Sequence, residues 1–432
     1  MSGAPAQNDK IGLLGAMAIG IGGMVGGGIF AVLGEAATIA RGATPLAFLL
    51  AGAIALLTAY AYAKLSVAYP SQGGTVVFFD KAFGVDLATG TLNLVLWLSY
   101  LVTLALYAVA FGSYGLTFFA GAKGPWLHHG LITVAIVLPV AINLLDAAIV
   151  SESESLIVAL KLVLLVIVIA AGLPHVDASR LAPTAWAAPA TIVAGGMVIF
   201  VAYEGFELIA NAAQDIGNPQ QTLPRALYGS VGFVITLYVL VAVVTVGTVP
   251  AARIAAVKDY ALAEAAKPAL GSIGFTLVAV SALLATASAI NATVYGNARL
   301  GYTLAKDGEL PEALERRVWN EPVSGVLIVG TLALLIANFI DLTEIAIISS
   351  AGFLLIFAAT NAAALRLGAA IGAKRWIALL GTGACTAALL ALLTHAYRDD
   401  PRALWVFLGF LALAFLFELS YGKWRRGPLR LQ

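Results

Sequence analysis

The chain has 432 residues, of which 61% are hydrophobic and only 11% are charged. Soluble domains carry roughly 25% charged residues, so this composition predicts an integral membrane protein. The net charge of +1 gives no reason to expect a nucleic-acid partner. Because there is one cysteine, Cys385, and the four histidines lack ligand-like spacing, we expect no intrachain disulfide, no metal site and no cofactor.

Twelve apolar stretches are each long enough to cross the hydrocarbon core of a membrane, which takes about 20 residues. No loop between them is long enough for a separate soluble domain, so we predict one all-α transmembrane domain over residues 1–432. The predicted spans cover residues 11–37, 44–69, 87–119, 129–146, 153–173, 189–213, 224–249, 270–298, 322–340, 343–366, 374–395 and 402–421.

The Lys and Arg residues of the short loops predict the orientation, because cytoplasmic loops carry an excess of both. With a cytoplasmic N-terminus, fifteen of these side chains fall on the cytoplasmic side and eight on the other side. We therefore expect a multi-pass protein of the cytoplasmic membrane with both termini inside the cell.

The first span contains the stretch "GIGGMVGGGIF" from Gly20 to Phe30, in which six residues are glycine. Each interior glycine destabilises a helix by roughly 1 kcal/mol relative to alanine. Close helix packing is one explanation, but consecutive glycines at 26–28 point around most of a helix, which favours an unwound segment. Non-helical backbone at membrane depth is tolerated only where it is buried in protein or lines a cavity. The run therefore predicts a cavity near the midplane.

The sixth span also has an unusual centre, because Gly205 lies between Glu204 and Glu207 in an otherwise apolar segment. A carboxylate at the bilayer centre is costly unless it faces a cavity or a partner. Two interpretations stay open for each glutamate. One is a structural group bonded to neighbouring helices, and the other is a group that faces the midplane cavity.

A lysine, Lys161, lies near the centre of the fifth span. A helix rises 1.5 Å per residue, so Lys161 is about 12–15 Å from either end of this span. That distance is about twice the reach of a lysine side chain, so a route to the membrane interface is poor. An ion pair with Glu204 or Glu207 and a role in ion coupling are the remaining interpretations.

The two unusual spans are five helices apart, which is the pattern of an inverted repeat whose first helices are discontinuous. We predict a first repeat over residues 11–173, a second over 189–366, and two additional helices over 374–421. Broken helices expose free N–H groups at one end and free carbonyls at the other. Such a pair of ends suits the carboxylate and the ammonium of an amino acid.

Three stretches carry a resemblance to a known family: "VGGGIF" (25–30), "FVAYEGFELIANAAQDIGNPQQTLPRAL" (200–227) and "NATVYGNARLGYTLAKDGELP" (291–311). Over nearly its whole length the chain resembles the amino acid–polyamine–organocation (APC) superfamily of transporters, which has the leucine-transporter-like fold. With "AEAAKPALG" (263–271) and the lysine in the fifth span, it is most similar to proton-coupled members of broad amino acid specificity.

The resemblance implies a substrate site at the two breaks. In such a site the backbone N–H groups of Gly26, Gly27 and Gly28 bind the substrate carboxylate. Glu204 and Gly205, in the broken segment of the sixth span, are also expected to line the substrate site. A glutamate at position 204 is less expected in the superfamily than one at 207. The carbonyls implied to bind the substrate amine belong to Met24, Val25, Phe200, Val201 and Tyr203.

The resemblance also implies how transport is driven. In the leucine-transporter-like fold a sodium ion lies between spans one, five and eight, and here the ammonium of Lys161 takes its place, facing the backbone near Gly22 and the hydroxyl of Ser288. A fixed positive charge at that position argues for a proton as the coupling ion. Glu207 is implied as a gating or structural carboxylate.

We therefore expect a proton-coupled symporter that works by alternating access. Its expected partners are an L-amino acid, a proton and the lipid bilayer, and a monomer is the simplest expectation. An exchanger or uniporter without proton coupling is the alternative within transport. A channel or sensor without turnover is a further class, whereas an enzyme is not expected because the spans lack catalytic or metal-binding clusters.

Overall fold

The computed structural model describes residues 10–119, 124–145, 148–315 and 323–422. In these ranges the chain is helical, and the β pairings are two isolated bridges. Nine of the described helices are long and apolar enough to cross a membrane, and two bent helix pairs pass the same test. One further apolar helix, α13 (Val323–Phe339), is 17 residues long. The result is a multi-pass all-α architecture.

The nine long helices agree with nine of the predicted spans. Their bounds are α3 Thr44–Ala68, α5 Leu87–Leu116, α6 Pro125–Leu145, α7 Ala148–Gly172, α10 Pro219–Thr248, α12 Ala261–Lys306, α14 Leu342–Arg366, α15 Arg375–Asp399 and α16 Pro401–Phe417. The two bent pairs are α1 (Leu13–Met24) with α2 (Gly28–Ala40), and α8 (Pro189–Val198) with η4 (Phe200–Glu207) and α9 (Leu208–Asn211). These pairs correspond to the first and sixth predicted spans.

Some predicted boundaries were wrong. The eighth span was expected to end at residue 298, but α12 continues to Lys306, because hydropathy reports the thickness of the membrane and not the end of a helix. The same helix changes direction at Gly271, whose φ of 62° is a left-handed value that favours glycine. The third span ends at Leu116 instead of 119. Two predicted boundaries, residue 146 at the end of the fourth span and residue 322 at the start of the ninth, lie outside the described residues.

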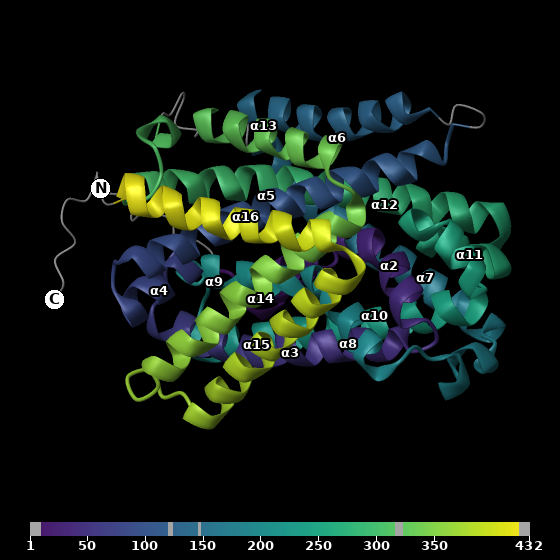
Figure 1. Cartoon of the computed structure of the whole chain (residues 1–432), viewed down its shortest axis with the longest axis horizontal. Coiled ribbons are helices and arrows are strands. Elements are labelled where there is room, and N and C mark those ends of the chain that lie inside the picture. The colour runs from purple at the N-terminus through teal and green to yellow at the C-terminus, as the bar shows by residue number, and fades with distance from the viewer. Residues whose placement is uncertain (1–9, 120–123, 146–147, 316–322, 423–432) are drawn as a thin grey trace, which may run out of the picture.

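Shorter helices connect the spans. The sequence did not predict α4 (Thr75–Phe83) or α11 (Ala251–Ala256), which are too short to cross a membrane. In Figure 1, α4 lies at one end of the long axis and α11 at the opposite end. The single-turn elements are η1 Leu173–His175, η2 Ala178–Leu181, η3 Pro183–Ala185, η5 Lys258–Tyr260, η6 Glu312–Glu315 and η7 Glu418–Gly422.

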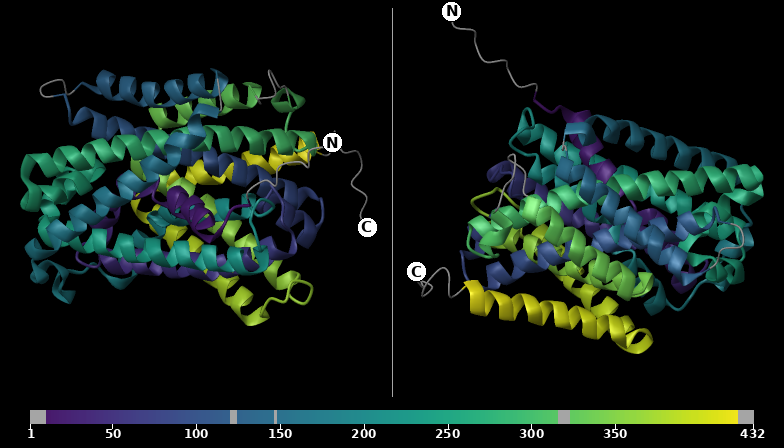
Figure 2. Two further views of the ribbon diagram at one scale, coloured as in Figure 1. Left: turned by 180° about the vertical axis from the view of Figure 1, so that it is seen from behind. Right: turned by 90° about the horizontal axis from the view of Figure 1, so that it is seen from above.

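The broken helices lie in the interior of the bundle. Seen from behind in Figure 2, the purple N-terminal helix is surrounded by the other helices. In Figure 1, α6 and α13 lie together along one edge, and α14 and α15 cross the bundle obliquely. Ahead of α1, the Ile11 backbone exchanges two hydrogen bonds with Asp215 and Gly217, at 2.9 and 3.0 Å, which ties the start of the first span to the end of the sixth.

An aromatic cluster packs against η4 and holds the second break in place. The Phe206 ring lies 5.5 Å from the ring of Tyr62 and 5.3 Å from that of Phe357. The Phe200 ring also packs on Phe357, at 5.7 Å. Because all four rings are buried, their packing fixes the path of the 3₁₀ segment against α3 and α14.

Candidate substrate and coupling site

The glycine run interrupts the first span. Helix α1 ends at Met24 and α2 begins at Gly28, and their axes differ by 49°. The sixth span is bent by 44°, and its centre, including Glu204 and Gly205, is a 3₁₀ segment. Both unusual features of the sequence therefore coincide with a break in a helix.

The glycines also allow the two breaks to touch. The backbones of Gly23 and Gly205 are in contact, since a Cβ on Gly23 would lie 2.7 Å from the Gly205 carbonyl oxygen. A Cβ on Gly28 would lie 2.9 Å from Cα of Ala202. Close packing and helix interruption, which the sequence presented as alternatives, are thus both properties of this run.

Backbone donors are left free at the first break. Val25 N–H still bonds to the Ile21 carbonyl at 2.7 Å, and Ala31 N–H bonds to Gly27 at 3.0 Å. In the described part of the chain, no acceptor is found for the N–H groups of residues 26–28. Buried backbone donors are nearly always paired, so these three are unusual.

The carbonyls at the breaks are partly occupied by a residue that the sequence analysis missed. The hydroxyl of Tyr238 in α10 lies 2.6 Å from the Met24 carbonyl oxygen and 3.3 Å from that of Ala202. Tyr238 is fully buried and therefore links both breaks through one side chain. In the sequence, the only indication of this role is a polar hydroxyl in an apolar span. Because tyrosine is common in membrane spans, that indication is weak.

A second missed residue, Ser350 in α14, bonds to the backbone beside the 3₁₀ segment. Its hydroxyl donates to the Val198 carbonyl at 2.7 Å and accepts from Val201 N–H at 3.0 Å. Of the other expected residues in this segment, Tyr203 donates its hydroxyl to the Phe48 carbonyl at 3.0 Å. The structure therefore brings the expected residues of spans one and six together and adds supports from α10 and α14.

The two glutamates differ in how well they are hydrogen-bonded. Glu207 accepts from Tyr62 at 2.6 Å, from Tyr100, and from Thr75 at 3.4 Å. These hydroxyls come from α3, α5 and α4, so Glu207 joins three elements to the sixth span. Glu204 has only distant partners, the hydroxyls of Tyr107 and Thr103 in α5, at 3.4 and 3.5 Å.

Lys161 lies in the interior, and its side chain is only 2% exposed. Its ammonium donates to the Gly22 carbonyl at 3.2 Å, so the side chain does not extend to the membrane interface. The absence of a Cβ on Gly22 lets α7 approach, since Val158, one turn before Lys161, lies where that Cβ would make a 3.1 Å contact. Neither Glu204 nor Glu207 is within ion-pair distance of Lys161, which removes that interpretation.

The third residue expected near the ammonium, Ser288, lies in α12, which packs against α7. In the part of the chain that the structure describes, no hydrogen bond joins Ser288 to Lys161. Its role in coupling therefore stays a prediction.

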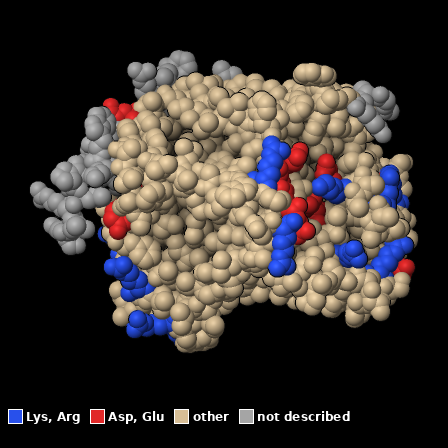
Figure 3. Space-filling model, in the orientation of Figure 1, with Lys and Arg blue, Asp and Glu red and all other residues tan. Residues whose placement is uncertain are grey.

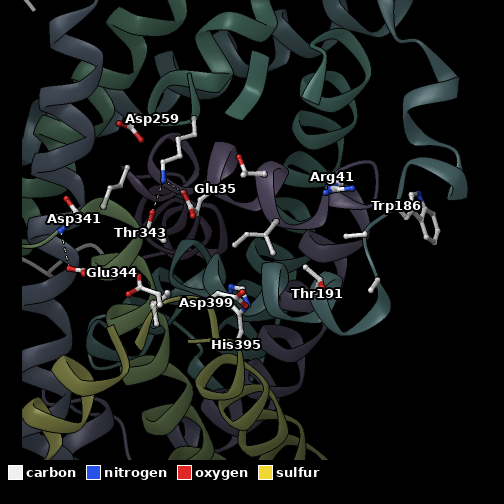
Figure 4. A pocket seen from close by; sticks show the side chains of 18 residues that line it. Glu35, Arg41, Trp186, Thr191, Asp259, Asp341, Thr343, Glu344, His395 and Asp399 are labelled. Atoms are coloured by element: carbon white, nitrogen blue, oxygen red, sulfur yellow. Dashed lines mark hydrogen bonds and ion pairs between the residues drawn. The ribbon is translucent and has the colours of Figure 1, made fainter. Parts of the chain in front are cut away.

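A polar cavity of about 910 Å³ opens among the loops predicted to be external. Charged side chains gather there while most of the same face carries none (Figure 3). The Lys258 ammonium pairs with Glu35 of α2 at 3.0 Å and donates to Thr343 of α14 at 2.9 Å (Figure 4). His395 pairs with Asp399 at 2.7 Å. Five segments distant in sequence line this cavity: residues 35–41, 186–191, 258–259, 341–347 and 395–400.

The family model described as "Amino acid permease" matches residues 11–422, nearly the whole chain. The chain belongs to the amino acid permease family. This membership confirms the resemblance to the APC superfamily and identifies the protein as a multi-pass membrane transporter and not an enzyme. The first helix break of the permease and the 3₁₀ segment of its sixth span fall within the stretches 25–30 and 200–227, which carry the resemblance in the sequence.

Relatives match this permease over most of its length. It is 35% identical to the uncharacterized protein MJ0609 of Methanocaldococcus jannaschii, over 96% of both chains. It is 32% identical to the inner membrane transport protein YbaT of Escherichia coli, over 95% of both. It is also 32% identical to the chloroplastic cationic amino acid transporter 9 of Arabidopsis thaliana, over 71% of this chain and 57% of that one.

Proposed function

We propose that this permease is a secondary active transporter that carries L-amino acids across the cytoplasmic membrane together with protons. In this proposal, twelve spans form two inverted repeats of five helices and two additional helices, and both termini lie in the cytoplasm. Alternating access to a site at the two breaks moves the substrate. Amino acid permease homologues, one of them named for cationic amino acids, support the substrate class.

The observation that carries the proposal is the set of free N–H groups at Gly26, Gly27 and Gly28. Helix α2 begins there, so the positive end of its dipole coincides with three unpaired donors. A substrate carboxylate would satisfy all three requirements of such a site: negative charge, several acceptor lone pairs and small size. The carbonyls of Met24, Val25, Phe200, Val201 and Tyr203 remain the proposed partners of the substrate amine.

The contact between Lys161 and Gly22 supports the proton as the coupling ion. The ammonium joins α7 to the inner half of the broken span, directly before the break. When protonated, Lys161 holds α7 and α1 together through a charge-assisted hydrogen bond. When it is deprotonated, that bond weakens and the helices are free to separate. A proton bound here therefore shifts the equilibrium between states by its differential affinity for them.

In this proposal Glu207 is a structural carboxylate that also contributes to gating, because it links the sixth span to neighbouring helices. Three hydroxyls from α3, α4 and α5 converge on its carboxylate. A movement of the sixth span relative to these elements requires the cluster to rearrange. Glu207 would therefore stabilise the state in which these elements are packed together.

The test is uptake into vesicles reconstituted with the purified permease. We expect radiolabelled L-amino acids to accumulate against their gradient when the external pH is lower than the internal pH. Accumulation should collapse with a protonophore, and replacing the proton gradient with a sodium gradient should not restore it. Equal uptake with and without a pH gradient would instead indicate an exchanger or uniporter, and absence of uptake and of binding for every amino acid would overturn the proposal.

A further inference from the structure

The carboxylate of Glu204 is buried with unused hydrogen-bonding capacity. Only 5% of the residue is exposed, and an ionised carboxylate offers about four acceptor positions. Its two partners, Tyr107 and Thr103, are 3.4 and 3.5 Å away, beyond the usual range of about 2.5–3.0 Å for O–H···O bonds. Glu207, three residues further on, has a hydroxyl at 2.6 Å and two more partners.

One of these partners is also engaged elsewhere. The Thr103 hydroxyl lies 2.5 Å from the hydroxyl of Ser349 in α14, one full ångström closer than it lies to Glu204. Because a threonine hydroxyl has a single proton, Thr103 donates to Glu204 only when Ser349 is the donor in the shorter bond, so this contact depends on a third side chain. Glu204 also lacks a cationic partner, since no Lys, Arg or His of the described chain is within ion-pair distance of it.

Glu204 is also close to the free backbone donors. Its partner Tyr107 packs directly on Gly27, where its ring would collide with a Cβ. The methyl group of Thr286 in α12 is the other neighbour of that position, at 3.1 Å from such a Cβ. The carboxylate of Glu204 therefore lies one aromatic ring away from the N–H groups proposed to hold the substrate carboxylate, on the side formed by α5.

We propose that Glu204 binds the side chain of the substrate, and that the permease selects amino acids whose side chain ends in a hydrogen-bond donor, an ammonium above all. This inference rests on the proposed function, because it assigns the substrate class of the same site. A buried carboxylate without a cation is expensive, and a substrate donor removes that cost only while it is bound. A purely apolar side chain leaves Glu204 unpaired and is therefore disfavoured.

The test compares pairs of ligands that differ only in the terminal donor. Suitable pairs are L-2,4-diaminobutyrate with L-norvaline, L-ornithine with L-norleucine, and L-threonine with L-valine. Within each pair the number of side-chain heavy atoms is equal, so shape and volume nearly cancel. For the wild type we expect the ammonium member of at least one pair to bind about ten- to a hundredfold more tightly, and threonine to be favoured by a smaller factor.

The test variant is Glu204→Gln, and its matched control is Glu207→Gln. Both remove one negative charge from the same 3₁₀ segment and keep nearly the same side-chain shape. In Glu204→Gln the ratio of affinities between the ammonium ligand and its alkyl partner should fall to near one. In Glu207→Gln the same ratio should be retained whatever the absolute affinities and turnover, because Glu207 is enclosed by hydroxyls.

Direct binding to purified permease, measured by thermal stabilisation and by calorimetry, gives the readout without transport. A preference for the ammonium ligand that survives in Glu204→Gln, or equal wild-type affinities within every pair, would overturn the inference while leaving an amino acid transporter in place. An equal loss for all ligands would also overturn it, since Glu204 would then bind the α-ammonium. Failure of every amino acid to bind would instead overturn the proposed function.

Discussion

Gly23 of the first span and Gly205 of the sixth lie with their backbones in direct contact. This contact is where the two broken helices meet, and it leaves no room for a side chain on either residue. Gly23 and Gly205 therefore set the distance between the breaks, and the free backbone groups on each side of the contact depend on that distance.

We predict that Gly205→Ala destabilises the permease by about 1–3 kcal/mol. The new Cβ would collide with backbone atoms of Gly23 and Met24, which cannot move away as the end of a side chain could. The measurement is the thermal unfolding midpoint in detergent. Gly232→Ala in α10 is the matched control, since nothing lies within 4 Å of its Cβ position. If both variants unfold at the wild-type temperature, the breaks are not in the close contact described.

Ser350 gives a second prediction. Ser350→Ala leaves the Val201 N–H and the Val198 carbonyl without their side-chain partner in the membrane interior, a loss of about 1–3 kcal/mol for each group. The substitution should also weaken substrate binding, because the 3₁₀ segment loses its anchor on α14. The thermal midpoint and the amino acid affinity are both measured.

Ser281→Ala is the control for Ser350. Ser281 is buried in α12, and its hydroxyl has no hydrogen-bond partner in the described chain, so its removal should be nearly neutral. Equal effects of the two serine variants would show that Ser350 has no special role at the break.

Removing the contacts of Lys258 in the polar cavity should shift the equilibrium between closed and open states. Lys258→Met removes both the ion pair to Glu35 and the hydrogen bond to Thr343, which together join α2, η5 and α14. Since the lysine side chain is 39% exposed, the loss of stability should be within about 1 kcal/mol. A change of that size in an opening equilibrium is about fivefold. The end of the bundle that holds the cavity, which is the outer end in the proposed orientation, should therefore open about two- to fivefold more often.

Thiol labelling from the external side measures this opening. Ile347 lines the cavity but is only 1% exposed, so Ile347→Cys should react slowly in the parent and faster with Lys258→Met. The native thiol, Cys385, is fully buried and gives little background. Lys267→Met, which breaks an ion pair to Glu264 outside the cavity, should leave the rate unchanged. An unchanged rate in Lys258→Met would mean that these contacts do not hold the outer end closed.

The sequence was sufficient to predict the helix breaks and the depth of Lys161. Six glycines in one span and two carboxylates around Gly205 both destabilise a continuous membrane-spanning helix. A membrane tolerates such residues only where they are buried in protein, have a partner or face a cavity. The depth of Lys161 followed from its position in the fifth span and the rise of about 1.5 Å per helical residue. Local rules of this kind need no knowledge of which helices are neighbours.

The supports of the site could not be predicted in the same way. Tyr238 and Ser350 act because one face of α10 and one face of α14 meet the breaks, and that depends on tertiary packing. The unequal surroundings of Glu204 and Glu207 depend on α5 in the same sense. The polar cavity brings together five segments distant in sequence, so no pattern within one of them predicts it.

In the proposed mechanism, protons drive transport through Lys161. We expect vesicles containing Lys161→Ala to lose all amino acid accumulation in response to an inward pH gradient, although substrate still binds. Lys81→Ala is the matched control, because Lys81 is exposed in α4 and outside the site. Uptake by wild type, Lys161→Ala and Lys81→Ala, with and without the gradient, is the most direct measurement. We expect gradient-driven uptake in the wild type and in Lys81→Ala only. Continued accumulation by Lys161→Ala would show that Lys161 is not the coupling site, and Glu204 or Glu207 would become the next candidate.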